Sequence, residues 1–216
     1  ADDIVEQVVE AIVNTARTLS YYRRLQEVTA NNVANANTDA FKADRMTARQ
    51  LPGLEYPVPV EQTDLEQGRL HETGRPLDVS IEGPGFFVVS MDGRGDPLVG
   101  AEGPIRVNGA QVEIKTDGTV LVDGAGAGRL RIETVDDPAS LLKEGSGRYV
   151  PKGALRPVPE TQVFVRQGSV EEANIDPLLS MVELVTIQRS YGANIDALRV
   201  LDGVLGVVTN SVGRVQ

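Results

Sequence analysis

The chain has 216 residues, of which 41% are hydrophobic and 24% charged, with a net charge of −10 and no cysteine. This length suits one domain with appendages or two small domains. The acidic balance argues against nucleic acid and against an anionic membrane surface as partners, because both repel a chain of their own sign. The lack of cysteine excludes disulfides and thiolate metal sites.

The first segment of the chain predicts a helix over residues 4–30. Apolar residues recur there at spacings of three and four from Ile4 to Val28, and neither glycine nor proline interrupts them. We therefore assign residues 1–36 to an N-terminal helix. Residues 37–64 contain several prolines and predict an extended linker.

The middle of the chain changes to short apolar runs separated by turn residues. This pattern is typical of a small antiparallel β domain, which we place at residues 65–165, followed by a return linker over residues 166–175. The predicted strands are Leu77–Ile81, Phe86–Val89, Ile105–Val107, Val112–Ile114, Thr119–Val122, Leu130–Ile132 and Val163–Val165.

The last segment, residues 176–216, predicts a long helix that starts with Asp176 as N-cap and Pro177 in the first turn. Its apolar residues form a heptad seam in which one position, Asn194, is polar. The seam comprises Leu184, Ile187, Tyr191, Asn194, Leu198, Leu201, Leu205 and Val208. A second stripe beside it comprises Met181, Val182, Val185, Ile195, Val204 and Val207.

The predicted fold is therefore α+β: a small antiparallel β domain flanked by N- and C-terminal helices that pair as a coiled-coil-like assembly module. The apolar face of a helix must be buried, and the C-terminal helix has more of it than one partner covers. The pattern alone leaves two interpretations open. Either the helices pack on the sheet of a self-contained domain, or they pack on neighbouring subunits.

The residue types that catalysis and metal binding require are scarce. His71 is the single histidine, which cannot by itself build a metal site. A strand rather than a helix is predicted after Gly124–Gly128, so this stretch predicts a flexible hairpin loop and not a phosphate loop. The carboxylate pairs at 136–137 and 171–172 are expected to be solvated or to cap helices. We therefore expect no catalytic residue, no metal and no cofactor.

An alternative function rests on the Arg94-Gly95-Asp96 tripeptide. A tight turn is the plain interpretation of this segment. The tripeptide nevertheless leaves open a self-contained extracellular β-domain module for binding or adhesion, with the helices as its stalk.

Four motifs, in order along nearly the whole chain, resemble the flagellar rod and hook axial family. Residues 30–42 resemble its N-terminal signature through Asn31, Asn32, Asn35, Asn37, Thr38 and Phe41. Residues 67–89 resemble the start of its β domain through Gly68, Leu77, Asp78, Gly83, Gly85, Phe86 and Phe87. Residues 167–175 resemble its return segment, and residues 181–191 resemble its C-terminal helix signature.

This resemblance implies a structural subunit of the bacterial flagellar basal-body rod, not an enzyme. Its terminal helices would polymerise into a tube around the export channel, with the β domain outside. The implied partners are further copies and other rod and hook axial proteins, and the flagellar export apparatus during secretion. The implied location is the rod in the periplasm, reached without a cleaved signal peptide and without direct membrane insertion.

Within the family, the proximal rod type is favoured over the distal type. Residues 75–79 and 100–105 look more like the proximal type, and the segment between Phe41 and Gln67 is short, as expected for it. The segment from Ser90 to Gly100 is shorter than the family pattern, so we expect a smaller outer domain. For Asn194 two placements remain, inside the subunit or between subunits; we predict the second, because a polar seam residue fixes register.

Overall fold

The computed structural model describes residues 2–50, 58–90, 98–100, 103–107, 111–145 and 147–212. The fold is α+β, as predicted. The chain forms two compact units, each described by itself below. Unit 1 contains Ala1–Ala36, Asp44–Gln62 and Ile175–Gln216, and unit 2 contains Asn37–Ala43 and Thr63–Asn174.

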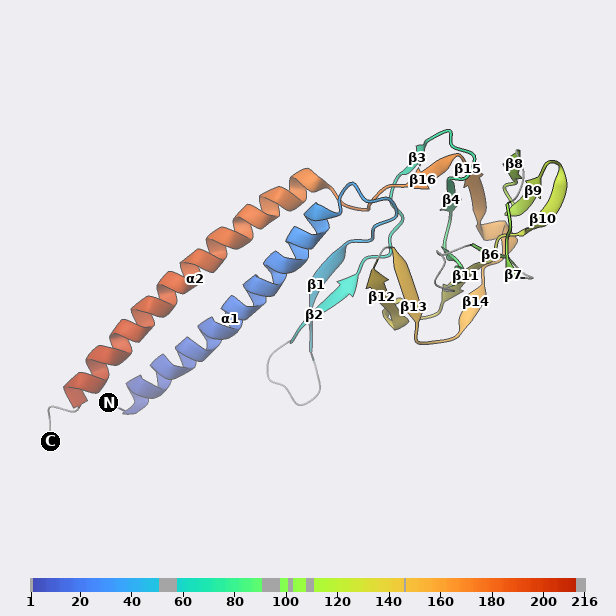
Figure 1. Cartoon of the computed structure of the whole chain (residues 1–216). Coiled ribbons are helices and arrows are strands. Elements are labelled where there is room, and N and C mark those ends of the chain that lie inside the picture. The colour runs from blue at the N-terminus through green and yellow to red at the C-terminus, as the bar shows by residue number, and fades with distance from the viewer. Residues whose placement is uncertain are drawn as a thin grey trace. The chain divides into compact units, whose positions relative to one another are not determined.

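Unit 1 is built on two long helices, α1 (Asp2–Ala34) and α2 (Pro177–Val212), which lie side by side and antiparallel (Figure 1). The predicted start of the second helix is confirmed. The Asp176 carboxylate accepts hydrogen bonds from the backbone N–H groups of Leu178 at 2.9 Å and Leu179 at 3.0 Å. These bonds satisfy donors that a helix N-terminus otherwise leaves without partners.

Unit 1 also contains two paired strands, β1 (Asp44–Arg49) and β2 (Val58–Thr63), in the segment where we expected an extended linker. An isolated two-stranded hairpin is marginally stable in water. Here β1 contacts α1, and Arg24 of α1 binds both Glu27, at 3.0 Å, and Glu61 of β2. The helix therefore supplies the support that the two strands lack by themselves.

The described residues of unit 2 form short strands and two 3₁₀ turns. Its strands are β3 (Leu70–Glu72), β4 (Val79–Glu82), β5 (Phe86–Phe87), β6 (Val99–Gly100), β7 (Gly103–Pro104), β8 (Val112–Ile114), β9 (Thr119–Val122), β10 (Ala125–Arg129), β11 (Ile132–Val135), β12 (Leu141–Gly145), β13 (Arg148–Pro151), β14 (Leu155–Pro157), β15 (Phe164–Gln167) and β16 (Ser169–Glu171). The turns are η1 (Pro138–Ser140) and η2 (Glu160–Gln162).

The first strands of unit 2 pair with its last strands. β3 is antiparallel to β16, with His71 opposite Val170, and β4 is antiparallel to β15, with Ile81 opposite Val165. The intervening chain forms small sheets in the orders β10-β9-β8, β14-β11-β5, β12-β13 and β6-β7. The two ends of this unit are thus held together by backbone pairing.

The core of unit 2 is small and aliphatic. Val120, Leu130 and Val165 are its most buried members, and Val120 and Val165 each expose 1% of their surface. The partly buried side chains packed against them are Phe87, Leu98, Ile105, Val112, Ile114, Ala127 and Ile132.

Two local predictions for the β domain are wrong. Ile105–Val107 is not a strand; β7 ends before it, and Ile105 contributes a side chain to the core instead. Gly124–Gly128 is not a flexible loop. Asp123 and Gly124 form the turn, with φ angles of 51° and 81°, and strand β10 follows at once. Asp-Gly is a preferred pair for such a two-residue turn.

A glycine substitution tests the close packing of the first residues of unit 2 against its return segment. A Cβ atom placed on Gly68 would lie 2.0 Å from the backbone carbonyl oxygen of Glu172. Replacing Gly68 with alanine should therefore force the return segment away and destabilise unit 2 by about 1–3 kcal/mol, as overpacking does. Urea unfolding followed by circular dichroism measures the change.

The matched control is Gly126→Ala, because a Cβ atom at Gly126 meets nothing within 4 Å. That variant should unfold at the same urea concentration as the parent chain. Equal stability of the two variants would contradict the close approach at Gly68.

Candidate assembly interface

The predicted heptad seam of α2 is its shielded face. Ile187 is 4% exposed, and the other seam residues, Leu184, Tyr191, Asn194, Leu198, Leu201, Leu205 and Val208, are half-buried. α1 packs against α2. On α1 itself, Val28 and Thr29 are buried, at 5% and 3% exposure. The seam therefore lies within the subunit, between its two helices.

The polar member of the seam, Asn194, makes its hydrogen bond within its own helix. Its side-chain amide donates to the carbonyl oxygen of Ser190 at 2.8 Å. The side chain is half-buried among the seam residues. The role between subunits that we predicted for Asn194 remains a prediction.

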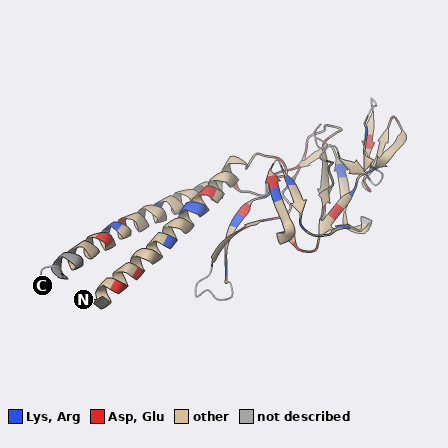
Figure 2. Ribbon diagram, turned by 60° about the horizontal axis from the view of Figure 1, so that its bottom comes forward, with Lys and Arg blue, Asp and Glu red and all other residues tan. Residues whose placement is uncertain are grey.

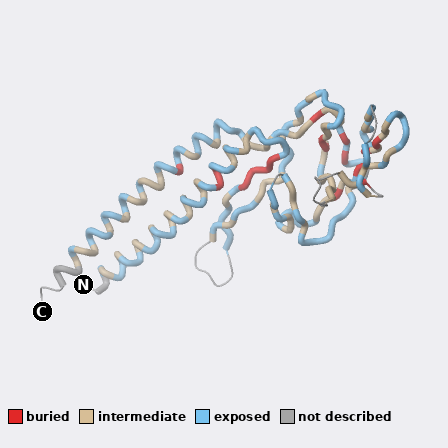
Figure 3. The backbone as a smooth tube through the Cα atoms, viewed as in Figure 1, coloured by how far each residue is buried: buried red, intermediate tan, exposed pale blue. Residues whose placement is uncertain are grey.

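The opposite side of α2 is apolar and exposed (Figure 3). We call it the outer face. Leu178 and Val207 are each 70% exposed and Val200 is 67% exposed, whereas globular proteins normally scatter such side chains singly. Its large apolar residues are Leu178, Val182, Val185, Val200, Val204 and Val207. Much of the predicted second stripe belongs to this face, although Ile195 is half-buried instead.

Of the signature asparagines, Asn31 and Asn32 lie in the last turn of α1, and Asn35 and Asn37 follow its end. The side-chain amide of Asn32 pairs with the backbone of Asp44 as a neighbouring strand would. It donates to the Asp44 carbonyl oxygen at 2.8 Å and accepts from the Asp44 N–H at 3.0 Å. It thereby fixes the start of β1. Asn35 donates to the carbonyl oxygen of Asn31 at 2.9 Å, which satisfies a helix-terminal acceptor.

The remaining signature residues lie in unit 2. Asn37 and Thr38 are exposed, and the Thr38 carbonyl oxygen accepts from the Phe41 N–H at 3.2 Å in a turn. Phe41 is 8% exposed, and the Lys143 ammonium lies 4.0 Å from the centroid of its ring. That geometry is a cation–π contact, which is stronger when desolvated.

A buried ion pair joins the two ends of unit 2. The Lys42 ammonium lies 2.6 Å from the Glu171 carboxylate, and these side chains are 9% and 16% exposed. Lys42 also donates to the carbonyl oxygen of Glu66 at 2.8 Å, and the same Glu171 oxygen accepts from the Gly68 N–H at 2.9 Å. The expectation that Glu171 is solvated or caps a helix is wrong. Its carboxylate is largely shielded from water and pairs with Lys42, which is distant in the sequence and therefore could not be identified from the local pattern.

Asn174 completes this arrangement, which we call the closure cluster (Lys42, Glu171 and Asn174). Its side-chain oxygen accepts from the Ala43 N–H at 2.7 Å, and its amide donates to the carbonyl oxygens of Asp64 at 2.9 Å and Glu66 at 3.0 Å. Three chain segments thus meet at one side chain. The return motif contained Asn174, but nothing in that motif indicated which groups it binds.

The β-domain signature residues have separate structural roles. Gly83 and Gly85 have φ angles of 120° and 119°, which side chains rarely adopt, and a Cβ atom on Gly83 would lie 2.3 Å from the Gln162 carbonyl oxygen. The Phe86 ring lies 5.6 Å from that of Tyr149, and Phe87 packs on the core. Leu77 is 65% exposed and takes part in no core.

Asp78 of the same signature stabilises the turn before β4. Its carboxylate accepts from the Thr73 hydroxyl at 2.6 Å and from the Arg75 guanidinium at 2.7 Å. The Thr73 hydrogen bond, and then that of Arg75, hold the pKa of Asp78 below its usual value.

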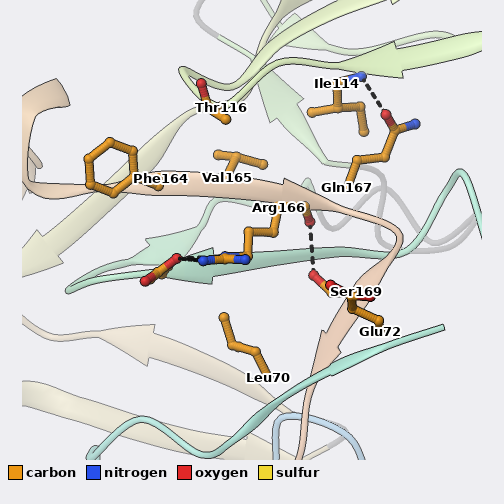
Figure 4. Close-up of a pocket in the computed structure, with 10 residues that line it drawn as sticks. Leu70, Glu72, Ile114, Thr116, Phe164, Val165, Arg166, Gln167 and Ser169 are labelled. Atoms are coloured by element: carbon orange, nitrogen blue, oxygen red, sulfur yellow. Dashed lines mark hydrogen bonds and ion pairs between the residues drawn. The ribbon is translucent and has the colours of Figure 1, made fainter. Parts of the chain in front are cut away.

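Unit 2 has an open cleft of about 610 Å³ beside β15 (Figure 4). Gln167 accepts from the Ile114 N–H at 3.0 Å on one side, and Arg166 pairs with Glu82 at 2.5 Å on another. The lining combines these paired polar groups with apolar side chains such as Phe164 and Leu70. Among the residues that line the cleft, no nucleophilic side chain lies beside a general base, so these residues do not form a catalytic site.

His71 is exposed on β3, and within the described ranges no three histidine, cysteine or carboxylate groups gather as metal ligands. The Arg94-Gly95-Asp96 tripeptide lies outside the described residues. In the part of the chain that the structure describes, neither α1 nor α2 is long and apolar enough to span a bilayer.

Two sequence families match the segments that build the helix pair and the closure cluster. "Flagella basal body rod protein" matches residues 14–42, and "Flagellar basal body rod FlgEFG protein C-terminal" matches residues 166–211. The chain is also similar to whole rod proteins. It is 28% identical to the flagellar basal-body rod protein FlgF of Caulobacter vibrioides over 205 residues, which is 78% of this chain and 84% of that protein.

Two further relatives cover similar shares. FlgF of Salmonella typhimurium is 26% identical over 82% of this chain and 88% of its own length. The flagellar basal-body rod protein FlgG of Bacillus subtilis is 25% identical over 85% of this chain and 92% of its own length.

The closure cluster predicts a large effect from removing one charge. Lys42→Met should destabilise unit 2 by about 3 kcal/mol, because it leaves the Glu171 carboxylate buried without its cation. Denaturant unfolding measures the change. A double variant that also carries Glu171→Leu should recover much of the loss.

The matched control is Arg166→Met, which breaks an exposed pair with Glu82 whose side chains are 52% and 47% exposed. It should cost less than about 1 kcal/mol. A Lys42→Met variant as stable as this control would contradict the role given to the closure cluster.

Asp78 predicts a pH dependence of defined sign. Because its pKa is lowered in the folded state, the carboxylate stabilises unit 2 above about pH 4, the ordinary aspartate range, and this contribution is lost as pH falls through the folded-state pKa. Asp78→Asn should therefore be less stable than the parent at pH 7, and the difference should shrink on acidification. Melting temperatures measured across this range test it; a difference that does not change with pH would argue against the Asp78 contacts.

Proposed function

We propose that this chain, a structural subunit of the bacterial flagellar basal-body rod in the FlgEFG family, is of the proximal rod type and polymerises through its terminal helices. The FlgF relatives are 26–29% identical to it, and the FlgG relatives are 22–25% identical. FlgF is the proximal type, so this difference supports the proximal assignment.

The outer face of α2 is the observation that carries the assembly mechanism. It leaves six large aliphatic side chains exposed by 42–70% on one side of a helix whose other side is already covered by α1. Burying one such side chain fully contributes about 1.5–3 kcal/mol. Covering this row against neighbouring helices would therefore contribute several times that amount, enough to drive association.

The same geometry favours an open assembly. A face on one subunit that meets a different face on the next is a heterologous contact, and such contacts produce filaments when the rotation does not close. The shielded seam fixes α2 against α1 within each subunit. The outer face is left to make the contacts that extend the rod, and the helix pairs would form its inner layer around an export channel.

Unit 2 is suited to be the outer part of such a rod. It has its own core in Val120, Leu130 and Val165 and its own closure cluster, so its fold does not depend on burying the outer face of α2. We infer that the subunit is exported without a cleaved signal peptide and joins other axial proteins in the periplasm. The order of family motifs along the chain supports this inference.

Substitutions on the two faces of α2 should differ in effect. Val207→Asp places a carboxylate on the outer face, where burial in an assembled rod would be strongly unfavourable, and should abolish motility while the isolated chain keeps its helix content. Leu198→Asp and Leu205→Asp lie on the shielded seam and should lower helix content as well as motility. Soft-agar swarming and circular dichroism measure the two effects.

Gln188→Asp, at an exposed position between the two faces, is the matched control and should leave both measurements unchanged. Normal swarming by cells that carry Val207→Asp would refute the outer face as an assembly surface.

Deletion of the gene tests the proximal assignment. Cells that lack the subunit should be non-motile, and electron microscopy of their basal bodies should show rods that stop short of the distal segment. Basal bodies with a full-length rod that lacks this chain would contradict the assignment, and complementation with the parent gene serves as the control.

A further inference from the structure

Strand β3 of unit 2 has one edge without a partner strand. Its other edge pairs with β16, and the Thr73 N–H donates to the Gly168 carbonyl oxygen at 2.8 Å at the end of this ladder. Bonded and non-bonded residues alternate along an antiparallel pair, so the N–H and C=O groups of Leu70 and Glu72 point away from β16. Within the described ranges, these four groups have no hydrogen-bond partner.

The free edges of two neighbouring strands are covered by other parts of the chain. At β4, the Gln67 side chain donates to the Ile81 carbonyl oxygen and accepts from the Gly83 N–H at 3.4 Å. At β16, the Glu171 carbonyl oxygen accepts from the Ala40 N–H at 2.6 Å. Among β3, β4 and β16, therefore, β3 is the strand whose edge is open to an added strand.

The open edge of β3 borders the cleft beside β15 (Figure 4). Side chains alternate along a strand, so Leu70 and Glu72 share the face of β3 that lines the cleft, and His71 lies on the other face. Phe164 lines the same cleft and is 53% exposed. A strand added to β3 would therefore direct alternate side chains toward a cleft that has apolar and charged walls.

The carboxylate of Glu72 determines which charge the added strand must carry. Glu72 is exposed, lies opposite Ser169 of β16, and makes no ion pair or side-chain hydrogen bond within the part of the chain that the structure describes. The other carboxylate of the cleft, Glu82, is paired with Arg166 at 2.5 Å. Opposite charges directly across two strands stabilise a sheet, so a fitting strand has a cation opposite Glu72.

We propose that β3 is a docking edge for an extended basic segment of a different protein, which adds to it as an antiparallel strand. Each outward residue of β3 would then exchange both backbone hydrogen bonds with one residue of the segment, and antiparallel pairing is the more stable kind. The segment passes Glu72 before Leu70. Its pattern is therefore a basic residue, any residue and an aliphatic residue, with alternate side chains giving the specificity.

A second copy of this chain fits the edge poorly. Two β3 strands paired about His71 would place Glu72 opposite Leu70, so neither carboxylate would meet a cation. Each copy also carries a net charge of −10, and molecules of like charge repel each other. The occupant is therefore a protein with a basic segment. This inference goes beyond the polymerisation proposed above and does not depend on it.

A short peptide tests the docking edge. The probe is fluorescein-labelled Thr-Thr-Arg-Thr-Val-Thr-amide, whose arginine can face Glu72 while its valine faces Leu70. It is titrated with the full-length chain at concentrations where sedimentation shows a monomer. We expect saturable binding by fluorescence anisotropy. Near saturation, amide exchange at Leu70 and Glu72, followed by NMR, should slow about tenfold because both N–H groups become hydrogen-bonded.

Two N-methylated peptides separate strand addition from side-chain binding. In the proposed pairing the N–H of the arginine points at β3, whereas the N–H of the threonine that follows it points away. Methylation of the arginine nitrogen should therefore weaken binding about tenfold, and methylation of that threonine nitrogen should change it less than about twofold. Equal binding of the two methylated peptides, or no binding of the unmodified probe, would overturn the proposal.

A charge reversal tests the role given to Glu72. Glu72→Arg should weaken the arginine peptide about tenfold, and it should bind the peptide with glutamate in place of arginine more tightly than the parent chain does. The matched control is Glu113→Arg, which changes the net charge equally at an exposed position of unit 2 that does not line the cleft. This control should leave the binding of both peptides within about twofold.

Three results would contradict the charge argument. They are equal binding of both peptides by the parent chain, equal effects of Glu72→Arg and Glu113→Arg, and a change in self-association caused by Glu72→Arg, which would identify a second copy as the occupant. Each of them overturns the docking proposal alone. The rod function is tested through the outer face of α2 and through basal bodies, so the two proposals fail separately.

Discussion

Unit 2 depends on a polar interaction between parts of the chain that are far apart in sequence. Lys42 and Glu171 are 129 residues apart, yet their charged groups lie 2.6 Å from each other in a site with little access to water. The small aliphatic core cannot by itself fix where the chain enters and leaves. The ion pair, the Asn174 side chain and the pairing of β3 with β16 hold these ends, and the short inner sheets are built between them.

Local periodicity was enough to predict the helices and the fold class, because a helix is built from neighbours in sequence. The Asp176 cap was predicted for the same reason. The strands β1 and β2 were missed, since their sequences are polar and their support comes from Arg24 on a distant helix. Glu171 was misjudged for a similar reason: a carboxylate near a turn looks solvated until its long-range partner is known.

The two apolar stripes of α2 show a related limit of sequence patterns. Both were visible as periodic apolar residues, but periodicity only indicates that a face must be covered, not by what. The structure assigns the heptad seam to the contact with α1 and leaves the outer face exposed. The longer and more regular pattern is therefore used inside the subunit, and the less regular one, interrupted by Arg189 and Asp196, faces outward.

The closure of unit 2 also has a consequence for the timing of folding. Contacts between its first and last strands give it a high contact order, and loop-closure entropy opposes such contacts until both ends are available. Whichever end of a polypeptide emerges first from a narrow passage, this unit cannot complete its fold until nearly all of it has passed through. For a chain that is transported unfolded, this topology would therefore postpone folding of unit 2 until both of its ends have left the passage.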